Sequence, residues 1–408
     1  MPDVATEKIV YYIGRIKCMN VSRCFMARSL LCLLVVVLPL LACGTDAGDT
    51  DAFTLDERDG VASAINSATT VWTPDDAPLQ FELEQTFGVA DAPEEAMLAG
   101  TSSVVVDDEG VVYLLDRGNH RLVAFNPDGT VRWSRGREGE GPGEFQNAFG
   151  FVPGPADDLL VVNQSGQRWE RWSYDGELLE SYDAGRIEGG GFFLSPVGFH
   201  NGTLIASSSA MGEEPVRVLQ VDLDALAVVD TLIERPLDFE LPEFFGYGLS
   251  NRLEGDHLWM ADVTAYVLQA YTRDGQLVRQ VERTDENRLL PPGIYTGDQG
   301  ARMSTFSGIS APLFLHDHLL VHSYWPTNLT DPNAHVRRQA RDQDVPEIAY
   351  DAALDLFTAE GQLRGRIHYE GMQTAAIGRP MTVGPDGKLY TTTADPFPQV
   401  RRYAVRMD

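Results

Sequence analysis

One local pattern recurs six times along this chain and restricts its fold more than any other feature. Each copy is an apolar stretch rich in β-branched or aromatic residues, then a tight polar turn, then a second apolar stretch. Such a pattern predicts an antiparallel hairpin. The turns are centred near residues 110, 158, 202, 257, 318 and 387. The repeat therefore predicts an all-β architecture built from similar units.

A second turn follows most of these hairpins, and several of these turns contain Asp-Gly or Glu-Gly. Glycine there supplies the positive φ that tight turns require. The second turns lie in NPDGTVRW (126–133), SYDGELLES (173–181), DLDALAVVD (222–230), TRDGQLVRQ (272–280) and TAEGQLRGR (358–366). Two hairpins per unit give four antiparallel strands in roughly 40–50 residues, which is typical of a β-propeller blade. A β-sandwich, the alternative, would lack this double-turn period.

The two ends of the repeat region complement each other. The sixth unit reaches Asp408 after only three predicted strands, and the segment LQFELEQTFG (79–88) alternates apolar and polar residues before the first hairpin. This segment can supply the missing outer strand, and a ring closed in this way leaves no exposed sheet edge. We therefore expect residues 79–408 to form one six-bladed β-propeller with four-stranded antiparallel blades. Little in the pattern indicates helix, apart from a single turn over 93–98.

The N-terminus looks like an export signal. Arg23 and Arg28 precede an apolar run over 30–42 that contains Pro39 and is too short for a spanning helix, which needs about 20 residues. The run ends in LLACG, which resembles a bacterial lipobox with Cys43 as the lipid attachment site. An ordinary signal peptide with a chance cysteine is the alternative. We expect a lipoprotein signal peptide over 1–42 and a lipidated, solvated acidic tether over 43–78, with one short strand at 61–65.

Charge and cysteine content narrow the function. The chain has 60 acidic and 32 basic residues and a net charge of −28. Nucleic-acid phosphates repel such a chain, so sequence-independent DNA or RNA binding is excluded. The four cysteines lie at or before Cys43. The exported domain is therefore predicted to have no disulfide and no thiol chemistry.

The first unit resembles a known repeat. VVYLLDRGNHRLVAFNPDGTVRW (111–133) resembles an NHL repeat, and GREGEGPGEF (136–145) resembles the glycine-rich linker between such repeats. With the lipobox, the chain is similar to the six-bladed β-propeller lipoproteins of bacteria. The match covers about 101–145, and residues 163–168 only faintly echo the loop over 116–121. The resemblance implies that Asp116, Asn119 and Arg121 mostly hold their own backbone.

Loop lengths distinguish the two faces of the predicted ring. Both hairpin turns of a blade lie on one face and are short throughout. The links between blades and the loops after each second strand lie on the other, and the long insertions fall there, at 184–194, 234–247, 284–309 and 324–348. Long loops on a rigid scaffold are where binding concentrates. We expect ligand binding on this long-loop face, with the channel mouth there as the default pocket.

Several side chains are candidate ligand contacts, each with a structural alternative. They are Asp116, Arg117, Asn119, Arg121, Arg137, Glu140, Arg168, Tyr324 and Trp325. The two aromatic residues begin the largest insertion and suit a sugar ring or a peptide, or else pack that loop down. The linker that contains Arg137 and Glu140 either contacts a ligand or is a structural wedge between two blades. Acidity disfavours anionic ligands unless arginines gather at the channel mouth, for which Arg117, Arg137, Arg168 and Arg217 are candidates.

Metal and catalytic sites have weak support in the sequence. His316, Asp317, His318 and His322 look like a ligand cluster but occupy a hairpin on the short-turn face, where solvated turn residues are expected. The sequence contains no G-x-S-x-G, H-E-x-x-H or P-loop motif. We therefore predict no catalytic residue, no metal ligand and no cofactor, while a calcium ion bound in the channel stays open.

These observations favour a binding or scaffold module over an enzyme. We expect an exported, lipid-anchored monomer in the cell envelope that binds an envelope protein, a peptide or a glycan through its long-loop face. Its membrane contact would be the lipidated Cys43 alone, at the outer membrane or facing the periplasm if the host has two membranes. The alternative is a metal-dependent enzyme similar to a lactonase or lyase, with its site in the central channel.

Overall fold

The structure is a computed structural model, and it divides the chain into two units, Met1–Gly48 and Asp49–Asp408. It describes residues 52–89, 93–190, 193–243, 245–262, 264–286, 288–298, 300–371, 377–394 and 396–407. The predicted signal peptide and Cys43 lie outside the described residues. In the part that is described, no helix is long and apolar enough to cross a membrane.

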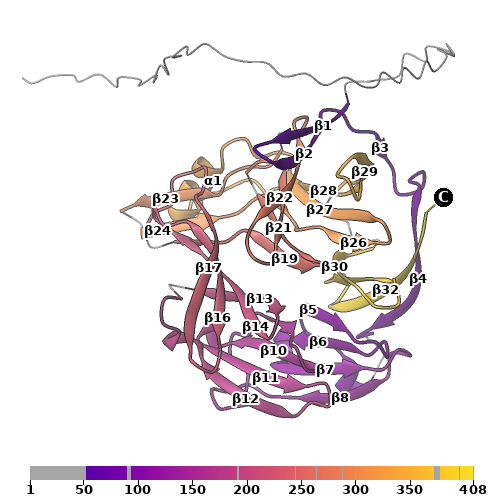
Figure 1. The fold of residues 1–408 in the computed structure, drawn as a ribbon, viewed down its shortest axis with the longest axis vertical. Helices are drawn as coiled ribbons and strands as arrows, with labels where there is room; N and C mark the ends of the chain where they lie inside the picture. The colour runs from indigo at the N-terminus through magenta and orange to yellow at the C-terminus, as the bar shows by residue number, and fades with distance from the viewer. Residues whose placement is uncertain are drawn as a thin grey trace, which may run out of the picture. The chain divides into compact units, whose positions relative to one another are not determined.

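The second unit is a ring of six antiparallel blades, as the repeat predicts (Figure 1). Each hairpin turn falls where the sequence places it, because the polar turn residues separate strands with buried apolar faces. Blade 1 contains β5 (Thr101–Val106), β6 (Val112–Asp116), β7 (Arg121–Phe125) and β8 (Val131–Arg135). Blade 2 contains β9 (Gly150–Pro153), β10 (Asp158–Asn163), β11 (Arg168–Ser173) and β12 (Leu178–Asp183). Blade 3 contains β13 (Leu194–His200), β14 (Thr203–Ser208), β16 (Val216–Asp222) and β17 (Ala227–Arg235).

The remaining blades keep the same order, innermost strand first. Blade 4 contains β19 (Ser250–Glu254), β20 (His257–Asp262), β21 (Val267–Thr272) and β22 (Leu277–Arg283). Blade 5 has a divided inner strand, β25 (Gly308–Ile309) and β26 (Leu313–Leu315), then β27 (His318–Pro326), β28 (Tyr350–Thr358) and β29 (Leu363–Tyr369). Blade 6 contains β30 (Arg379–Val383), β31 (Leu389–Thr393), β32 (Gln399–Met407) and β4 (Leu79–Phe87).

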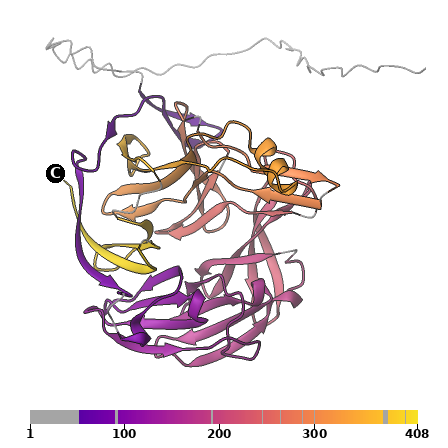
Figure 2. The same cartoon turned by 180° about the vertical axis from the view of Figure 1, so that it is seen from behind.

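The ring closes as predicted, with an N-terminal strand completing the last blade. β4 runs antiparallel to β32, and their register extends from Leu79 opposite Met407 to Phe87 opposite Val400. Figure 2 shows these two segments side by side, purple beside yellow. The alternating sequence of β4 places Leu79 and Phe87 in the core, at 1% and 0% exposed.

Residues 52–72 differ from the predicted solvated tether, and we call them the N-terminal strap. β1 (Phe53–Arg58) and β2 (Val61–Asn66) form a hairpin, and β3 (Val71–Trp72) follows. β2 pairs in parallel with β22 of blade 4, and β3 pairs in parallel with β29 of blade 5. The strand expected at 61–65 is confirmed as β2. It is held because Asn66, at 1% exposed, donates to the Gly361 carbonyl over 3.0 Å and accepts from the Leu363 amide over 2.7 Å.

The core lies between the blades. One cluster of buried apolar residues fills each of the six blade interfaces in the described ring. Between blades 1 and 2, for example, Tyr113, Trp133, Phe145 and Trp172 pack together. Burial of aromatic rings on this scale supplies a large share of the stabilising free energy. The blades are therefore held as a rigid ring around the central channel.

The long connections form small structures of their own. β23 (Gly293–Gly297) and β24 (Gly300–Ser304) make a hairpin that packs on α1 (Pro332–Ala340) through Tyr295, Phe306 and Val336. This helix was not predicted from the sequence, although Asp331 caps it by accepting from the Ala334 amide over 2.8 Å. In blade 3 a pair of two-residue strands, β15 (Ala210–Met211) and β18 (Gly246–Tyr247), joins two loops. The turn expected over 93–98 is η1 (Glu94–Ala96), and other single turns are η2 (Arg117–Asn119), η3 (Gln164–Gly166) and η4 (Ala184–Arg186).

Candidate functional site

A cavity of about 600 Å³ lies in the central channel. Five inner strands line it, namely β5, β9, β13, β19 and β30, and the turns that contain Gly154, Asn201 and Arg273 complete it. The expected pocket lay at the mouth on the long-loop face. The observed pocket instead lies along the inner strands and reaches the short-turn face, because the three turns that line it belong to that face.

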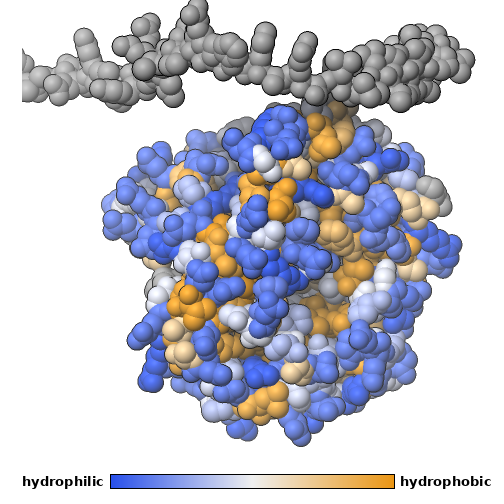
Figure 3. All heavy atoms as spheres, viewed as in Figure 1, coloured by the Kyte–Doolittle hydropathy of each residue, from blue (hydrophilic) through white to orange (hydrophobic). Residues whose placement is uncertain are grey.

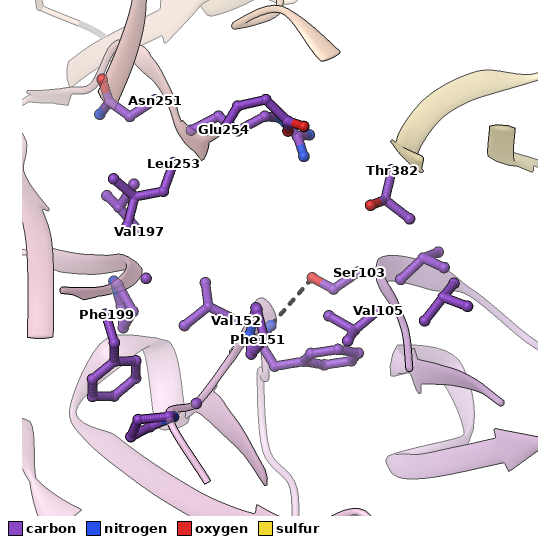
Figure 4. Close-up of a pocket in the computed structure, with 18 of the residues that line it drawn as sticks. Ser103, Val105, Phe151, Val152, Val197, Phe199, Asn251, Leu253, Glu254 and Thr382 are labelled. Atoms are coloured by element: carbon purple, nitrogen blue, oxygen red, sulfur yellow. Dashed lines mark hydrogen bonds between the residues drawn. The ribbon is translucent and has the colours of Figure 1, made fainter. Parts of the chain in front are cut away.

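The wall of this channel pocket combines apolar and polar groups in similar measure. Figure 4 shows Val197 and Leu253 on one side of an open space, with Val105 and Thr382 on the other side. On the face drawn in Figure 3, hydrophilic residues cover most of the surface. Hydrophobic patches lie between them, several of them near the centre of the view. Consecutive residues of an inner strand line the pocket, as residues 103–106 of β5 and 251–254 of β19 do.

Three charged side chains line the pocket, and sequence reasoning missed them. Arg252 and Glu254 come from β19, and Arg273 comes from the turn between β21 and β22. Arg252 Nη2 donates to the Met381 carbonyl over 2.9 Å, so its side chain links blade 4 to blade 6. One feature of the sequence could have identified Arg252 and Glu254: they are two residues apart in a predicted inner strand, and this spacing places both on one face of that strand.

The electrostatics of this pocket reflect its partial isolation from water. Burial lowers the pKa of the Arg252 guanidinium and raises the pKa of the Glu254 carboxyl. Arg379, the first residue of β30, is exposed, and its charge lowers the pKa of Arg252 further. Among the described residues, no carboxylate lies within ion-pairing distance of Arg252 or Arg379. Glu254 lies close enough to attract Arg252 without forming an ion pair.

The predicted contacts in blade 1 bond mostly to one another. Asp116 is 0% exposed and accepts from Arg121 Nε over 3.0 Å and from Asn119 Nδ2 over 2.7 Å. Arg121 also donates to the Met97 carbonyl over 2.6 Å, which fixes the chain as it enters the blade. Arg117 is exposed in η2. A ligand role for these four residues stays a prediction.

The same pairing of positions recurs in the next two blades. Asp116 lies opposite Arg121, Asn163 lies opposite Arg168, and Ser208 lies opposite Arg217. Arg168 forms an ion pair with Glu170 over 3.1 Å and donates to the Glu144 carbonyl over 2.6 Å. Arg217 forms an ion pair with Glu234 over 3.0 Å. These arginines therefore support blade structure, and they do not line the channel pocket.

The linker after blade 1 has the wedge geometry that was its structural alternative. Phe145 is 1% exposed between blades 1 and 2, and Gly136 has a φ of 103°. A Cβ at Gly136 would lie 2.3 Å from the Phe145 ring, so only glycine fits there. The Arg137 side chain is 79% exposed and pairs with Glu144. Glu140 is exposed and accepts from Gln146 Nε2 over 3.3 Å.

The two aromatic candidates differ in exposure. Trp325 is only 4% exposed, because Arg288 and Arg366 lie over its ring at 4.9 and 5.0 Å from the ring centroid. It therefore packs the insertion down and does not present its ring to a ligand. Tyr324 is partly exposed, and its ring centroid lies 6.3 Å from that of Tyr350.

The histidine-rich hairpin is not a compact ligand cluster. His316 and Asp317 are exposed in the turn, and His318 Nδ1 lies 2.6 Å from Asp317 Oδ1. His322 is buried farther along β27, where burial and then the charge of Arg379 lower its pKa to about 4. Within the described ranges, no group of three or more His, Cys, Asp or Glu side chains is arranged to hold a metal ion.

The long-loop face also carries a depression of about 1360 Å³ at blade 3. Two loops line it, 211–215 and 236–243. Its charged residues are all acidic, namely Glu213, Glu214, Asp238, Glu240 and Glu243. Because the whole chain is acidic, this charge does not distinguish the depression from the rest of the surface.

Comparison with known proteins identifies the fold and no family. No family profile matches the chain, and no curated relative is found by sequence. A member of the DUF4221 family from Bacteroides vulgatus matches with a TM-score of 0.55 at 12% identity, over 81% of this chain and 99% of that one. A protein from Bacteroides fragilis, named as an exported protein, matches with a TM-score of 0.55 at 11% identity, over 85% and 99%. At such identities the matches establish the propeller fold alone.

Proposed function

We propose that this chain is an exported, lipid-anchored binding protein that takes its ligand in the central channel. The channel pocket carries the proposal: at about 600 Å³ it has the size of a typical ligand site, and strands of five blades hold its wall. A wall of paired strands is preorganised, so a ligand would bind with little ordering cost. A free small molecule fits this pocket, and so does a projecting group of an envelope protein, peptide or glycan.

We do not favour the lactonase-like or lyase-like alternative. The charged groups lining the pocket are two arginines and one carboxylate, Glu254. Calcium and magnesium sites instead need several oxygen ligands around one point. The pocket is therefore better suited to holding a ligand than to polarising one through a metal ion.

Export and lipid anchoring rest on the LLACG sequence, and the NHL-like assignment rests on blade 1. The recurring pairs Asp116–Arg121 and Asn163–Arg168 support a common blade pattern. The name of the Bacteroides fragilis match agrees with export. The test of anchoring is metabolic labelling with an alkyne fatty acid in a bacterial host. We expect the full chain to be labelled and membrane-bound, and Cys43→Ser to be unlabelled. Equal labelling of both would contradict lipidation at Cys43.

Binding in the channel is tested with a variant that fills it. Val152→Trp adds an indole to the pocket wall, and Val229→Trp on the outer strand β17, at 56% exposed, is the matched control. The full-length proteins are purified from the producing cells, and the compounds released on denaturation are identified by mass spectrometry. We expect a compound released from the wild type and the control but not from Val152→Trp. The same compounds from all three proteins, or none from the wild type, would refute channel binding.

A further inference from the structure

We infer that the channel pocket recognises a ligand with one carboxylate and an apolar body. This inference rests on the proposed function, because it specifies the chemistry of the same site. The first observation is that the charge of the pocket lining is opposite in sign to the net charge of the chain. The chain carries 60 acidic and 32 basic residues, yet the pocket lining contains Arg252 and Arg273 against Glu254 alone. Arg379 adds a third positive charge next to Arg252.

Arg252 is the anchor of this site. A guanidinium has five N–H donors and stays protonated in proteins. A hydrogen bond to the Met381 carbonyl fixes the Arg252 side chain across the channel. Its remaining donors have no carboxylate among the described residues within ion-pairing distance. Because burial already disfavours its charged form, an anion bound beside it would offset a real electrostatic cost.

Arg379 strengthens the case, because it is exposed outside the pocket lining but lies close enough to Arg252 for its positive charge to act there. Burial is the largest cause that lowers the pKa of Arg252 and of His322 on β27, and the charge of Arg379 lowers both pKa values further. A bound anion would relieve the repulsion between the two arginines. Attraction between opposite charges is stronger where water is excluded, so the channel amplifies the effect.

The rest of the pocket selects the kind of anion. Val152, Val197 and Leu253 form an apolar part of the mixed wall, against which a hydrocarbon or aromatic body can pack. The planar fork of Arg252 matches the two oxygens of a carboxylate. Glu254 on the same strand repels a second negative charge on the ligand. The site is therefore suited to a monocarboxylate better than to phosphate or to a dicarboxylate.

The experiment uses probes of matched shape on the full-length protein in mild detergent. Benzoate, benzamide and benzylammonium differ mainly in charge, and inorganic phosphate is the alternative anion. Calorimetry or ligand-observed NMR gives each affinity. We expect benzoate to bind roughly tenfold or more tightly than benzamide, and benzylammonium and phosphate to bind more weakly still.

Three variants locate the effect. Arg379→Gln removes an exposed charge that forms no ion pair with the residues described, and we expect it to weaken benzoate binding several-fold. Arg302→Gln, exposed on β24 away from the pocket, should leave the affinity unchanged. Val152→Trp should abolish binding.

Each unfavourable outcome identifies what has failed. Equal affinity for benzoate and benzamide, both abolished by Val152→Trp, would overturn the carboxylate inference and leave channel binding intact. Preference for phosphate would overturn it in favour of a phosphorylated ligand. Benzoate binding that survives Val152→Trp would place the anion outside the channel. Absence of benzoate binding at millimolar concentrations would also overturn the inference, whereas the proposed function depends on the separate test of co-purifying compounds.

Discussion

His322 makes the stability of this propeller depend on pH in a defined window. Its side chain lies in β27 with 9% exposure. Burial is the larger cause that lowers its pKa from 6.5 to about 4, and the positive charge of Arg379 on β30 adds to it. Asp355 on β28 acts in the opposite direction, and the Tyr324 ring, which is also on β27, has its centroid 6.3 Å from that of His322. The folded protein therefore holds His322 neutral at pH values where the unfolded chain would protonate it.

The sign and size of this effect on the free energy of unfolding follow from proton linkage. Between pH 6.5 and about 4 the unfolded chain binds a proton at this position that the folded chain does not. Stability therefore falls as the pH is lowered through this window and does not change through His322 above it. The whole interval corresponds to about 3 kcal/mol at about 1.4 kcal/mol per pH unit, of which about 2 kcal/mol is lost by pH 5.

The assay compares wild type with His322→Gln by urea unfolding at pH 8, 6.5, 5.5 and 5. At pH 8 the variant should be less stable, because glutamine fits the buried site imperfectly. We expect this difference to shrink by about 2 kcal/mol at pH 5, since the variant cannot gain the proton. Glu254 has a raised pKa in both proteins, so its titration cancels in the comparison.

His316→Asn is the matched control, because His316 is exposed at a φ of 55° that asparagine tolerates in the same hairpin. Its pH profile should follow that of the wild type. A constant difference between wild type and His322→Gln from pH 8 to 5 would refute the linkage argument. It would mean that the His322 site opens to water or finds a hydrogen-bond partner when protonated.

Other predictions concern the features that hold the blades and the strap. Asp355→Asn should lower the free energy of unfolding by about 3 kcal/mol, because it removes the fully buried carboxylate and leaves Glu286 and Asp285 to pair with Arg366 and Arg283; urea unfolding at pH 8 measures this. Phe145→Ala should cost about 3–5 kcal/mol through a cavity between blades 1 and 2, and retention of the wild-type melting temperature would contradict its role as a wedge. Asn66→Ala should cost about 1–3 kcal/mol and increase amide exchange in β2 while the opposite blades keep their protection; unchanged exchange would show that the side chain does not hold the strap.

The sequence predicted the blades because their signals are local. Turn residues such as Gly129 and Gly275, with φ values of 88° and 86°, mark second hairpins without reference to the rest of the chain. Ring closure was also predictable, because the last unit lacked a strand and the segment before the first unit alternated. The helix α1 carried the local signal Asp331–Pro332, but it spans only nine residues and shows no sustained period.

The strap and the pocket could not be predicted in the same way. β2 has the composition of a strand, but its partner β22 lies more than 200 residues away, and nothing local specifies a parallel pairing. The channel lining depends on the register of each inner strand, which decides whether Arg252 faces the channel or the blade. Trp325 shows the converse problem, since an aromatic residue beside a long insertion has the same pattern whether it is buried or exposed. Arg288 and Arg366 bury the Trp325 ring through tertiary contacts, which the local sequence does not show.

The pairing of the first strands with distant partners also constrains the order of folding. β2, β3 and β4 are synthesised before any blade, yet they pair with β22, β29 and β32. They can find no native partner until most of the chain has appeared, and the ring stays open until its last strand is available. Contacts of such long sequence separation carry a high loop-closure cost and slow the folding of β proteins. A chain with this topology cannot complete its ring until its synthesis is nearly finished.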